Sequence, residues 1–395
     1  MILARMSLPT KSVLADDVQI VRRVLAHIDA GTTDEGAPWR EPVENYVSAS
    51  RFADELRLLR AMPSVFVPSA AIPAPGDHVE RVAFGVPLFA VRGHDRRARV
   101  FRNACRHRGF ALVEKPGCAH ALVCRYHGWT YRLDGSLSHV PHAEAFPGLD
   151  ASTRGLVEVE SHEVDGLIVI GALDAPGLDD DAMAALTDGS PWRDKLLPAQ
   201  RLVNADSTVR AMNWKVLVEQ FLEGYHLRST HRDTFYPVQY DDLNVVETFG
   251  PNSRLTFPYR NIERLRDRPE STWNVDARIT YVYHLFPNVM VATFPDVVSV
   301  VVIDPVDVEH TTVSTYSMVK PEVAERAPHD PSMRLVGAGS FIERGLAEDN
   351  EMSAGVQRGL HSGANEFVEF GRHESAIGHF HATLGDRLAR SATAF

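Results

Sequence analysis

The stretch "NACRHRGFALVEKPGCAHALVCRYHGW", residues 103–129, carries two cysteine–histidine pairs. Cys105 and His107 form the first pair, and Cys124 and His127 form the second after an interval of sixteen residues. Thiolates and imidazoles are metal ligands, but a lone zinc finger typically groups Cys with Cys and His with His. The alternating order suits two adjacent metal atoms, of which one takes both sulfurs and the other both nitrogens. A [2Fe–2S] cluster with two Cys on one iron and two His on the other is such a group.

A second group of candidate ligands follows in "NWKVLVEQFLEGYHLRSTH". The segment 207–231 reads as a helix because its apolar residues recur at helical spacing. On a regular helix Glu219, Glu223 and His226 share one face, whereas His231 lies five residues beyond His226 and points elsewhere. Both histidines bind one metal only if the helix is distorted or ends between them. The pattern alone therefore leaves two alternatives open, a metal site and an ordinary pair of surface histidines near a helix end.

Several motifs together resemble one protein family. "CRHRG" and "CRYHGW", followed by "TYRLDGSL", resemble the Rieske domain of the ring-hydroxylating, non-haem iron oxygenase alpha subunits. "NWK", "YH" with a second His five residues on, "HLFPNVM" and "VIDPV" resemble the catalytic domain of the same family. The resemblance spans roughly residues 40 to 390. Respiratory Rieske proteins carry an additional Cys pair that joins the two loops; Cys118 is the one cysteine left over here, so we expect it to pack.

The resemblance implies the ligands of both metal sites. It implies that a Rieske [2Fe–2S] cluster is held by two Cys and two His, namely Cys105, His107, Cys124 and His127. It also implies a mononuclear Fe(II) held by His226, His231 and a carboxylate from "LAEDNEMSAGVQRGL". That carboxylate is Asp349 in the match, with the adjacent Glu348 as the alternative.

Glu223 stands where the family most often has Asp. The resemblance implies that this carboxylate accepts a hydrogen bond from a cluster His on one side and from an iron His on the other. It would thereby couple the two centres across a subunit boundary. Glu keeps the charge and adds one methylene, so the bridge can survive with altered geometry. Members that resemble carnitine oxygenases have Glu at this place, which favours a quaternary ammonium substrate as one alternative.

The function implied by the resemblance is that of a terminal oxygenase component. It would use O₂, and electrons from a flavin- and iron–sulfur-containing NAD(P)H reductase, to mono- or dioxygenate a small organic substrate, aromatic or carboxylated. A ferredoxin is a further candidate partner, and the family's head-to-tail ring implies a homotrimer or a multiple of trimers. One alternative is oxidation or demethylation of a quaternary ammonium compound. Two others, from different classes, are a Rieske electron-transfer protein and a zinc-stabilised interaction protein.

Composition limits the classes further. A formal net charge of -11 over 395 residues argues against a nucleic-acid partner, for which basic patches should dominate. The longest apolar runs, such as "GLIVIGAL" at 166–173, are too short to span a membrane. We read no export signal at the start of the sequence. Three cysteines cannot form a disulfide framework, so we expect a cytoplasmic protein.

The elements expected to position these residues follow from local pattern. Residues 16–30 place five apolar side chains on one helical stripe that ends at Gly31. From about 64 to 172 the sequence consists of short β-like runs broken by Gly and Pro. After the helix expected over 207–231 come two clear strand segments, "ARITYVYHLFPNVMVATF" and "VVSVVVIDPV". Two helices are expected near the end, at 335–361 and 374–391.

The resulting fold class is α+β. We expect an all-β Rieske [2Fe–2S] domain at 46–172 and an α+β, helix-grip-like catalytic domain with an antiparallel sheet at 173–395. Residues 1–45 should form an N-terminal helical segment that packs on the catalytic domain. The Gly- and Asp-rich stretch 174–183 is the best candidate for a linker.

The substrate pocket should draw on residues 236–300, where aromatic side chains cluster. These aromatics could form a cage for a trimethylammonium group, stack on an aromatic ring, or simply pack in the core. They are Tyr259, Trp273, Tyr281, Tyr283, Phe286 and Phe294. The basic stretch 260–268 suits contact with a carboxylate, with a solvated charged loop as the alternative.

Overall fold

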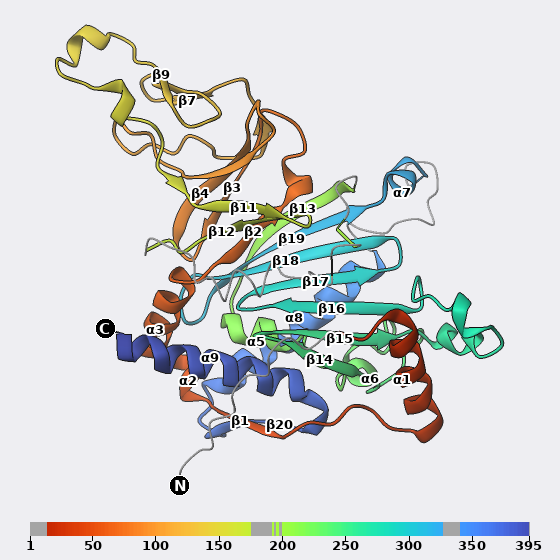
Figure 1. Cartoon of the computed structure of the whole chain (residues 1–395). Coiled ribbons are helices and arrows are strands. Elements are labelled where there is room, and N and C mark those ends of the chain that lie inside the picture. Colours follow the sequence, from red (N-terminus) through yellow and green to blue (C-terminus); the bar gives the residue numbers. More distant parts are fainter. Residues whose placement is uncertain (1–13, 175–191, 193–194, 197–199, 327–339, 395) are drawn as a thin grey trace.

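The structure, a computed structural model, describes residues 14–174, 192, 195–196, 200–326 and 340–394. A β-rich region, residues 64–170, stands at one end of a larger region built on a single seven-stranded sheet (Figure 1). All strand pairs of the sheets described are antiparallel, and helices pack around the large sheet. The α+β class expected from the sequence is therefore confirmed. The linker expected at 174–183 lies, apart from Asp174, outside the described residues.

The β-rich region consists of three small sheets. Their strand orders are β10-β5-β4-β3-β6, β11-β12-β2 and β7-β8-β9. The strands are β2 (Ser64–Pro68), β3 (Asp77–Ala83), β4 (Val86–Arg92), β5 (Ala98–Arg102), β6 (Gly117–Cys118), β7 (Leu122–Val123), β8 (Thr130–Tyr131), β9 (Leu137–His139), β10 (Glu158–Val159), β11 (Ser161–Val164) and β12 (Leu167–Ile170). Short strands joined by Gly-containing turns match the sequence pattern.

The large sheet has the order β13-β19-β18-β17-β16-β15-β14. Its strands are β13 (Arg201–Arg210), β14 (Val245–Phe249), β15 (Asn252–Pro258), β16 (Ile279–Leu285), β17 (Val289–Phe294), β18 (Val297–Pro305) and β19 (Thr311–Val319). In β16 and β18 every residue is buried, so both faces of the sheet centre are covered. This explains why these two strands read as continuous apolar runs rather than as alternating ones.

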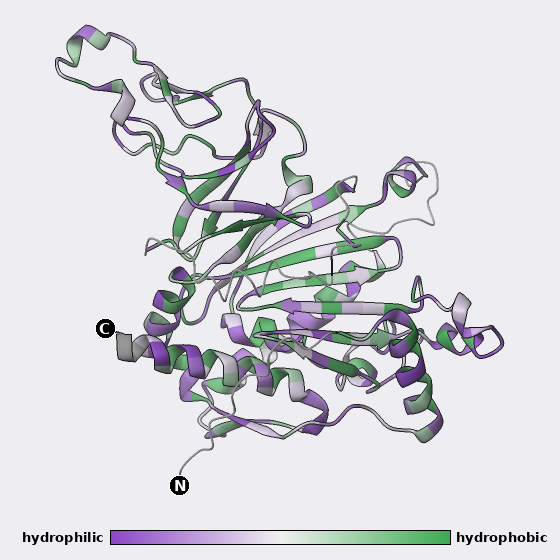
Figure 2. Cartoon of the chain, viewed as in Figure 1, coloured by the Kyte–Doolittle hydropathy of each residue, from purple (hydrophilic) through white to green (hydrophobic). Residues whose placement is uncertain are grey.

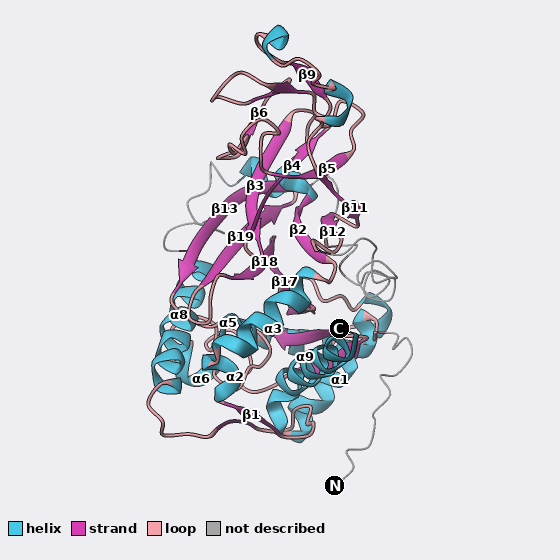
Figure 3. Ribbon diagram, turned by 90° about the vertical axis from the view of Figure 1, so that its left-hand side faces the viewer, coloured by secondary structure: helices cyan, strands magenta, loops and turns pink. Residues whose placement is uncertain are grey.

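Most of the helices lie on the side of this sheet that faces away from the β-rich region (Figures 1 and 3). They are α1 (Asp17–Ala30), α2 (Glu44–Val47), α3 (Ala49–Arg60), α5 (Trp214–Glu219), α6 (Leu227–Thr230), α7 (Pro321–Arg326), α8 (Phe341–Leu360) and α9 (Ser375–Ala394). A two-stranded ribbon pairs β1 (Trp39–Pro42) with β20 (Phe367–Phe370). A capping box at Asp16 and Gln19 begins α1, and Gly31 ends it with a φ of 61°, as the sequence predicts.

The N-terminal elements are attached to the large-sheet region. Ala15 donates its N–H to Glu247 of β14, and Tyr281 of β16 donates to Asp17. On α3, the buried carboxylate of Glu55 accepts hydrogen bonds from the Trp214 indole (2.9 Å) and the Lys215 ammonium (2.8 Å) of α5. Residues 49–60 therefore contact the large-sheet region, although the sequence assigned them to the Rieske domain. The domain division itself stays a prediction.

The prediction of a single helix over 207–231 is wrong. Strand β13 continues to Arg210, α5 covers only Trp214–Glu219, and the chain turns before the short α6. Asn213 begins α5 by accepting the N–H of Lys215 at 3.0 Å. In the turn Leu222 is fully buried, and a Cβ at Gly224 would lie 2.5 Å from Asn244 Oδ1. Tertiary packing thus bends a segment whose apolar spacing alone suggested a continuous helix.

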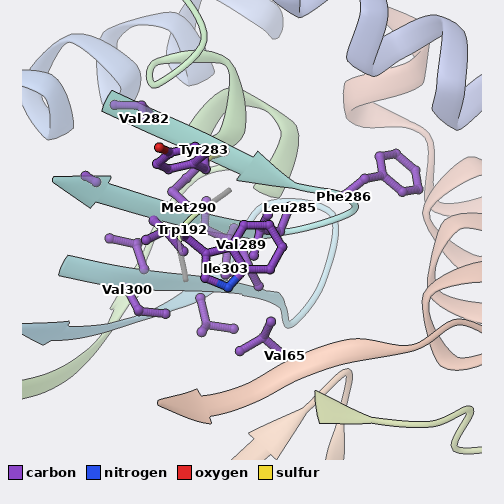
Figure 4. Close-up of a cluster of buried hydrophobic side chains, with 14 of the residues drawn as sticks. Val65, Trp192, Val282, Tyr283, Leu285, Phe286, Val289, Met290, Val300 and Ile303 are labelled. Carbon is purple, nitrogen blue, oxygen red and sulfur yellow. The ribbon is translucent and has the colours of Figure 1, made fainter. Parts of the chain in front are cut away.

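Hydrophobic residues gather on the central strands of the large sheet (Figure 2). Figure 4 shows Val65 of β2 beside Val300 and Ile303 of β18, and all three belong to one buried cluster. The β-rich region and the large sheet therefore share a continuous core. A separate, smaller cluster fills the far part of the β-rich region and contains both Cys105 and Cys124.

Candidate metal centres

Two loops of the β-rich region have the same backbone hydrogen bonds. In the first, Cys105 N donates to Phe110 O (2.8 Å), and Gly109 N donates to Cys105 O (2.9 Å). In the second, Cys124 N donates to Trp129 O and Gly128 N to Cys124 O, both at 2.8 Å. Gly109 and Gly128 have φ values of 77° and 75°, which residues other than glycine rarely adopt. The sequence spacing of Cys, His and Gly therefore builds two equivalent loops.

The four candidate cluster ligands separate into a buried and an outer pair. Cys105 and Cys124 are free thiols with only 3% and 2% exposure. The rings of His107 and His127 lie with centroids 4.7 Å apart, and His127 is exposed. Trp129 stacks on His107. The structure thus brings together the four residues predicted from the sequence, with the sulfurs inside and the imidazoles outside.

These residues fit a cluster with two thiolates and two imidazoles. Burial raises the pKa of the Cys105 thiol, so its thiolate needs a nearby positive charge. Tyr131 OH lies 3.3 Å from Cys105 Sγ, and it accepts the N–H of Arg106. The tyrosine was not singled out from the sequence. Its position in "TYRLDG", directly after the second loop, is the signal that marks it.

A second constellation lies beneath the large sheet. His226 and His231 stand at the two ends of α6, and Asp349 lies on α8. One ligand atom from each of the three lies within 4.8 Å of the others. His226 Nε2 is 3.2 Å from His231 Nε2, and Asp349 Oδ1 is 2.9 Å from the latter and 3.5 Å from the former. Adjacent ligand atoms at ~2.1 Å from one ion would be separated by about 3 Å, so the three residues fit a single metal.

The second nitrogen of each imidazole is engaged by a carboxylate. His226 Nδ1 makes a short contact with Glu223 Oε1, and His231 Nδ1 lies 2.8 Å from Glu348 Oε2. Thr234 Oγ1 donates to the same Glu348 oxygen at 2.5 Å. Such partners fix the tautomer that leaves Nε2 free for a metal. The geometry therefore assigns Asp349 to the metal side and Glu348 to the outer side of His231, a distinction that the sequence left open.

Charge in this site is arranged for a cation. Burial alone would raise the pKa of Asp349, but the two imidazoles hold it below the ordinary range. Burial lowers the pKa of His226, and Asp349 and Glu223 more than offset this and raise it to about 10. The Asp349 shift shows that the imidazoles favour its ionised form, and the His226 shift shows that the two carboxylates favour a positive charge at this imidazole.

Glu223 lies in the turn between α5 and α6. One carboxylate oxygen contacts His226 Nδ1, and the other accepts the N–H groups of Tyr225 (2.5 Å) and His226 (3.2 Å). The side chain keeps 12% exposure, and the neighbouring Tyr225 is 65% exposed. The predicted contact of Glu223 with a candidate iron histidine is therefore present, and the partner is His226. Its contact with a cluster histidine of another subunit stays a prediction.

A small cavity opens beside the three candidate iron ligands. It has a volume of about 80 Å³, and we call it the apolar chamber. Its walls come from one face of β15–β18, from the α5–α6 segment and from α8. The apolar side chains are Phe221, Leu227, Phe235, Phe257, Val282, Ala292, Phe294, Val301, Ile342 and Leu346. A dry pocket beside a metal site suits the binding of an organic substrate.

Most of the aromatics expected at the pocket lie elsewhere. Thr280 and Val282 of β16 line the chamber, so the alternating Tyr281 and Tyr283 face away from it. Of the six aromatics, Phe294 alone lines the chamber. Phe235 and Phe257 line it too, and the sequence analysis missed both. The basic stretch 260–268 begins with a short 3₁₀ helix, Arg260–Leu265, and none of its residues lines the chamber.

The structure tests the expectation for the remaining cysteine. Cys118 lies exposed on β6, so the expectation that it packs is wrong; a two-residue edge strand leaves no room to bury its side chain. Among the residues that the structure describes, no helix is both long and apolar enough to cross a bilayer.

Two family models match the sequence. The Rieske [2Fe–2S] domain matches residues 63–158, and the ring hydroxylating alpha subunit (catalytic domain) matches residues 197–390. The first match contains both Cys–His loops, and the second contains the two histidines and Asp349.

Individual relatives extend these matches. The chain is 30% identical over 209 residues to the carnitine monooxygenase oxygenase subunit of Escherichia coli K12. The aligned region covers 51% of this chain and 55% of that protein. The chain thus spans about half the length of that relative. It is 28% identical over 362 residues to the glycine betaine monooxygenase oxygenase subunit of Chromohalobacter salexigens, with 80% of each protein covered. Naphthalene 1,2-dioxygenase from Rhodococcus sp. shares the fold at a TM-score of 0.71 and 18% identity, covering 94% of this chain and 98% of that one.

Proposed function

The chain belongs to the Rieske-type, ring-hydroxylating oxygenase alpha subunits, and from this membership we propose that it is the terminal oxygenase component of a multicomponent system. The proposed reaction is the mono- or dioxygenation of a small organic substrate with O₂. The observation that carries the proposal is the set of three atoms, His226 Nε2, His231 Nε2 and Asp349 Oδ1, at the wall of an apolar chamber.

Each group of residues has a defined part in this proposal. The matching domains bind a [2Fe–2S] cluster and a mononuclear iron, which supply single electrons and O₂ activation when bound. Cys105, Cys124, His107 and His127 would hold the cluster, and His226, His231 and Asp349 would hold the iron. Glu223 and Glu348 orient the two iron histidines. The apolar chamber positions the substrate and excludes water.

The partners follow from the same proposal. Electrons would arrive from an NAD(P)H reductase with flavin and iron–sulfur centres, directly or through a ferredoxin. We propose a homotrimer, or a multiple of trimers, in which the cluster of one protomer serves the iron of its neighbour through Glu223. The low cysteine content, with all three cysteines free, supports a cytoplasmic location.

Oxidation or demethylation of a quaternary ammonium compound is the second candidate. It is supported by Glu223 and by the names of the relatives that act on carnitine and glycine betaine. Three phenylalanines, Phe235, Phe257 and Phe294, line the chamber, and aromatic rings attract cations.

The proposal is tested by reconstitution with a reductase, NADH and ¹⁸O₂. We expect ¹⁸O in an organic product when a substrate is present. The double variant His226→Ala/His231→Ala should form no product and yet keep the visible absorption of the cluster. Product formation by that variant would contradict the assignment, and a wild-type protein that passes electrons without oxygenating any substrate pool would be an electron carrier.

A further inference from the structure

A second, larger cavity adjoins the apolar chamber. It has a volume of about 500 Å³ and lies between α8 and the β13 edge of the large sheet; we call it the polar chamber. Its polar side chains include Asn204, Asp206, Arg210, Thr315, Ser317 and Asn350. The apolar chamber, by contrast, contains no Lys or Arg among its lining residues.

The two chambers adjoin each other and share part of their walls. Gln220, Phe221, Val301, Ile342 and Leu346 line both. Strand register explains this shared wall, because Ser299 of the apolar chamber pairs with Ser317 of the polar chamber on the neighbouring strand. Directly paired residues share a face of an antiparallel sheet, so both chambers lie on the same face and under the same helix α8.

Arg210 is the unusual residue of the polar chamber. It is the one cation among the described residues that line the chamber, and no described residue forms an ion pair with its guanidinium. The two acidic residues of the chamber are engaged differently: Asp206 accepts a hydrogen bond from Thr208 at 2.8 Å, and Glu343 has a partner of its own. An anion in the chamber would therefore supply the charged partner that the described residues do not provide for this guanidinium.

Size indicates how a substrate would use both chambers. The apolar chamber, at about 80 Å³, is smaller than the roughly 150 Å³ cavity that accommodates benzene in a protein core. A substrate larger than a few carbon atoms must therefore extend past Phe221 and Leu346 into the polar chamber. Resting on the proposed oxygenase function, we propose that the substrate is an amphiphilic carboxylate whose apolar end lies beside the iron ligands and whose carboxylate binds Arg210.

The proposal distinguishes this chain from a binder of bare cations. A guanidinium matches a carboxylate with two parallel hydrogen bonds, and it repels an ammonium head group. A zwitterionic substrate would bind Arg210 only through its carboxylate. Arg210 is thus a specificity residue for the head group of the substrate, in the chamber that the metal ligands do not line.

Three probes that share a phenylalkyl chain and differ in their head group test this proposal directly. The probes are 3-phenylpropionate, its amide, and (3-phenylpropyl)trimethylammonium, titrated calorimetrically into the anaerobic, iron-loaded protein. We expect the acid to bind ~10- to 100-fold more tightly than the amide, as for loss of a charge-assisted hydrogen bond, and the cation to bind no better than the amide. In Arg210→Gln the preference for the acid should disappear.

Arg201→Gln is the matched control, because Arg201 lies on the same strand but is 59% exposed and outside both chambers. It should keep the full preference for the acid. Unchanged cluster absorption and melting temperature would show that Arg210→Gln remains folded. Equal binding of the three probes, strongest binding of the cation, no binding of the acid, or a preference that survives in Arg210→Gln would each overturn the proposal. Binding needs no turnover, so an inactive oxygenase that prefers the acid would refute the proposed function and leave this inference standing.

Discussion

Both candidate iron histidines use Nε2 toward the metal position and Nδ1 toward a carboxylate, Glu223 for His226 and Glu348 for His231. The two carboxylates differ in setting. Glu348 is also fixed by the hydroxyl of Thr234, whereas Glu223 lies in a turn beside the exposed Tyr225. The exposed fraction of the side chain is 12% for Glu223 and 30% for Glu348, so exposure alone does not distinguish the two carboxylates and their roles must be separated by replacement.

The adjacent acids Asp349 and Glu348 should respond differently to replacement. Asp349→Ala removes a ligand atom and should leave the protein without mononuclear iron. Glu348→Gln keeps the iron but should weaken its binding ~10- to 100-fold, because an amide orients His231 less well than a carboxylate. Iron content and competition with a chelator measure both effects. Loss of iron in Glu348→Gln together with retention in Asp349→Ala would reverse our assignment.

Glu223→Gln should keep both metal centres and slow electron transfer from cluster to iron about 10- to 100-fold, since the charge beside His226 Nδ1 is lost. Single-turnover oxidation of the reduced cluster, followed optically with substrate and O₂ present, gives the rate. Glu348→Gln makes the same chemical change at the other imidazole. Measured at equal iron loading, it should leave the rate close to that of the wild type. Equal slowing in both variants would show that Glu223 has no special role in transfer.

Helix α8 carries one of the candidate iron ligands and also lines both chambers. Its residues Asp349, Ile342 and Leu346 face the apolar chamber, and Asn350 faces the polar chamber. Gly345 lies on the same helix against Phe235, and a Cβ there would be 2.3 Å from Phe235 Cε2. The Phe235 ring in turn packs edge-on against His231. Because Gly345 has no side chain, Phe235 can pack closely against α8, and this contact fixes the position of the Phe235 ring in the wall of the site.

Two glycines of this helix make a matched pair. Gly345→Ala should destabilise the fold by ~1–3 kcal/mol through overpacking, and it should push Phe235 toward the chamber and weaken iron and substrate binding. At Gly359 a Cβ meets nothing within 4 Å, so Gly359→Ala should be neutral or stabilise the helix by up to about 1 kcal/mol. Denaturant unfolding and iron affinity distinguish the two. Similar behaviour of both variants would refute the role given to the close approach of Gly345 to Phe235.

At the scale of the whole molecule, the two metal centres lie far apart in one chain. Figures 1 and 3 show the β7–β9 end of the β-rich region at one extremity and α6 beneath the large sheet at the other. His127 and Tyr126 are exposed at the first end, and Tyr225 at the second. A head-to-tail ring would bring these ends of neighbouring protomers together, and three-fold rotation closes such a contact.

Mixed oligomers test this arrangement. Cys105→Ser, which lacks the cluster, and His226→Ala, which lacks the iron, should each be inactive as pure oligomers. Co-expressed with different tags and purified through both, the mixed trimers should regain about a third of wild-type turnover, because every trimer that holds both variants has one interface in three that joins an intact cluster to an intact iron site. Mixed oligomers as inactive as the parents would show that electrons stay within one chain.

The sequence was most informative where chemistry demands fixed spacing. Cys105, His107, Cys124 and His127 lie on two local loops, so their grouping followed from the motif alone. The position of His231 did not, because the turn after α5 depends on the burial of Leu222 against the rest of the fold. The residues that line the apolar chamber could not be predicted from the sequence either. Whether Val282 or Tyr283 faces the chamber depends on strand register, and both faces of β16 are buried, so hydrophobic alternation gives no indication.

Electron paramagnetic resonance of the anaerobic, fully reduced protein with nitric oxide tests the central claim, that one chain holds a Rieske cluster and a separate iron site that opens to substrate. We predict a Rieske signal together with an iron–nitrosyl signal, and we predict that 3-phenylpropionate perturbs only the nitrosyl signal. A Rieske signal without any nitrosyl signal, in protein replete with iron, would contradict the account and reduce the chain to an electron carrier.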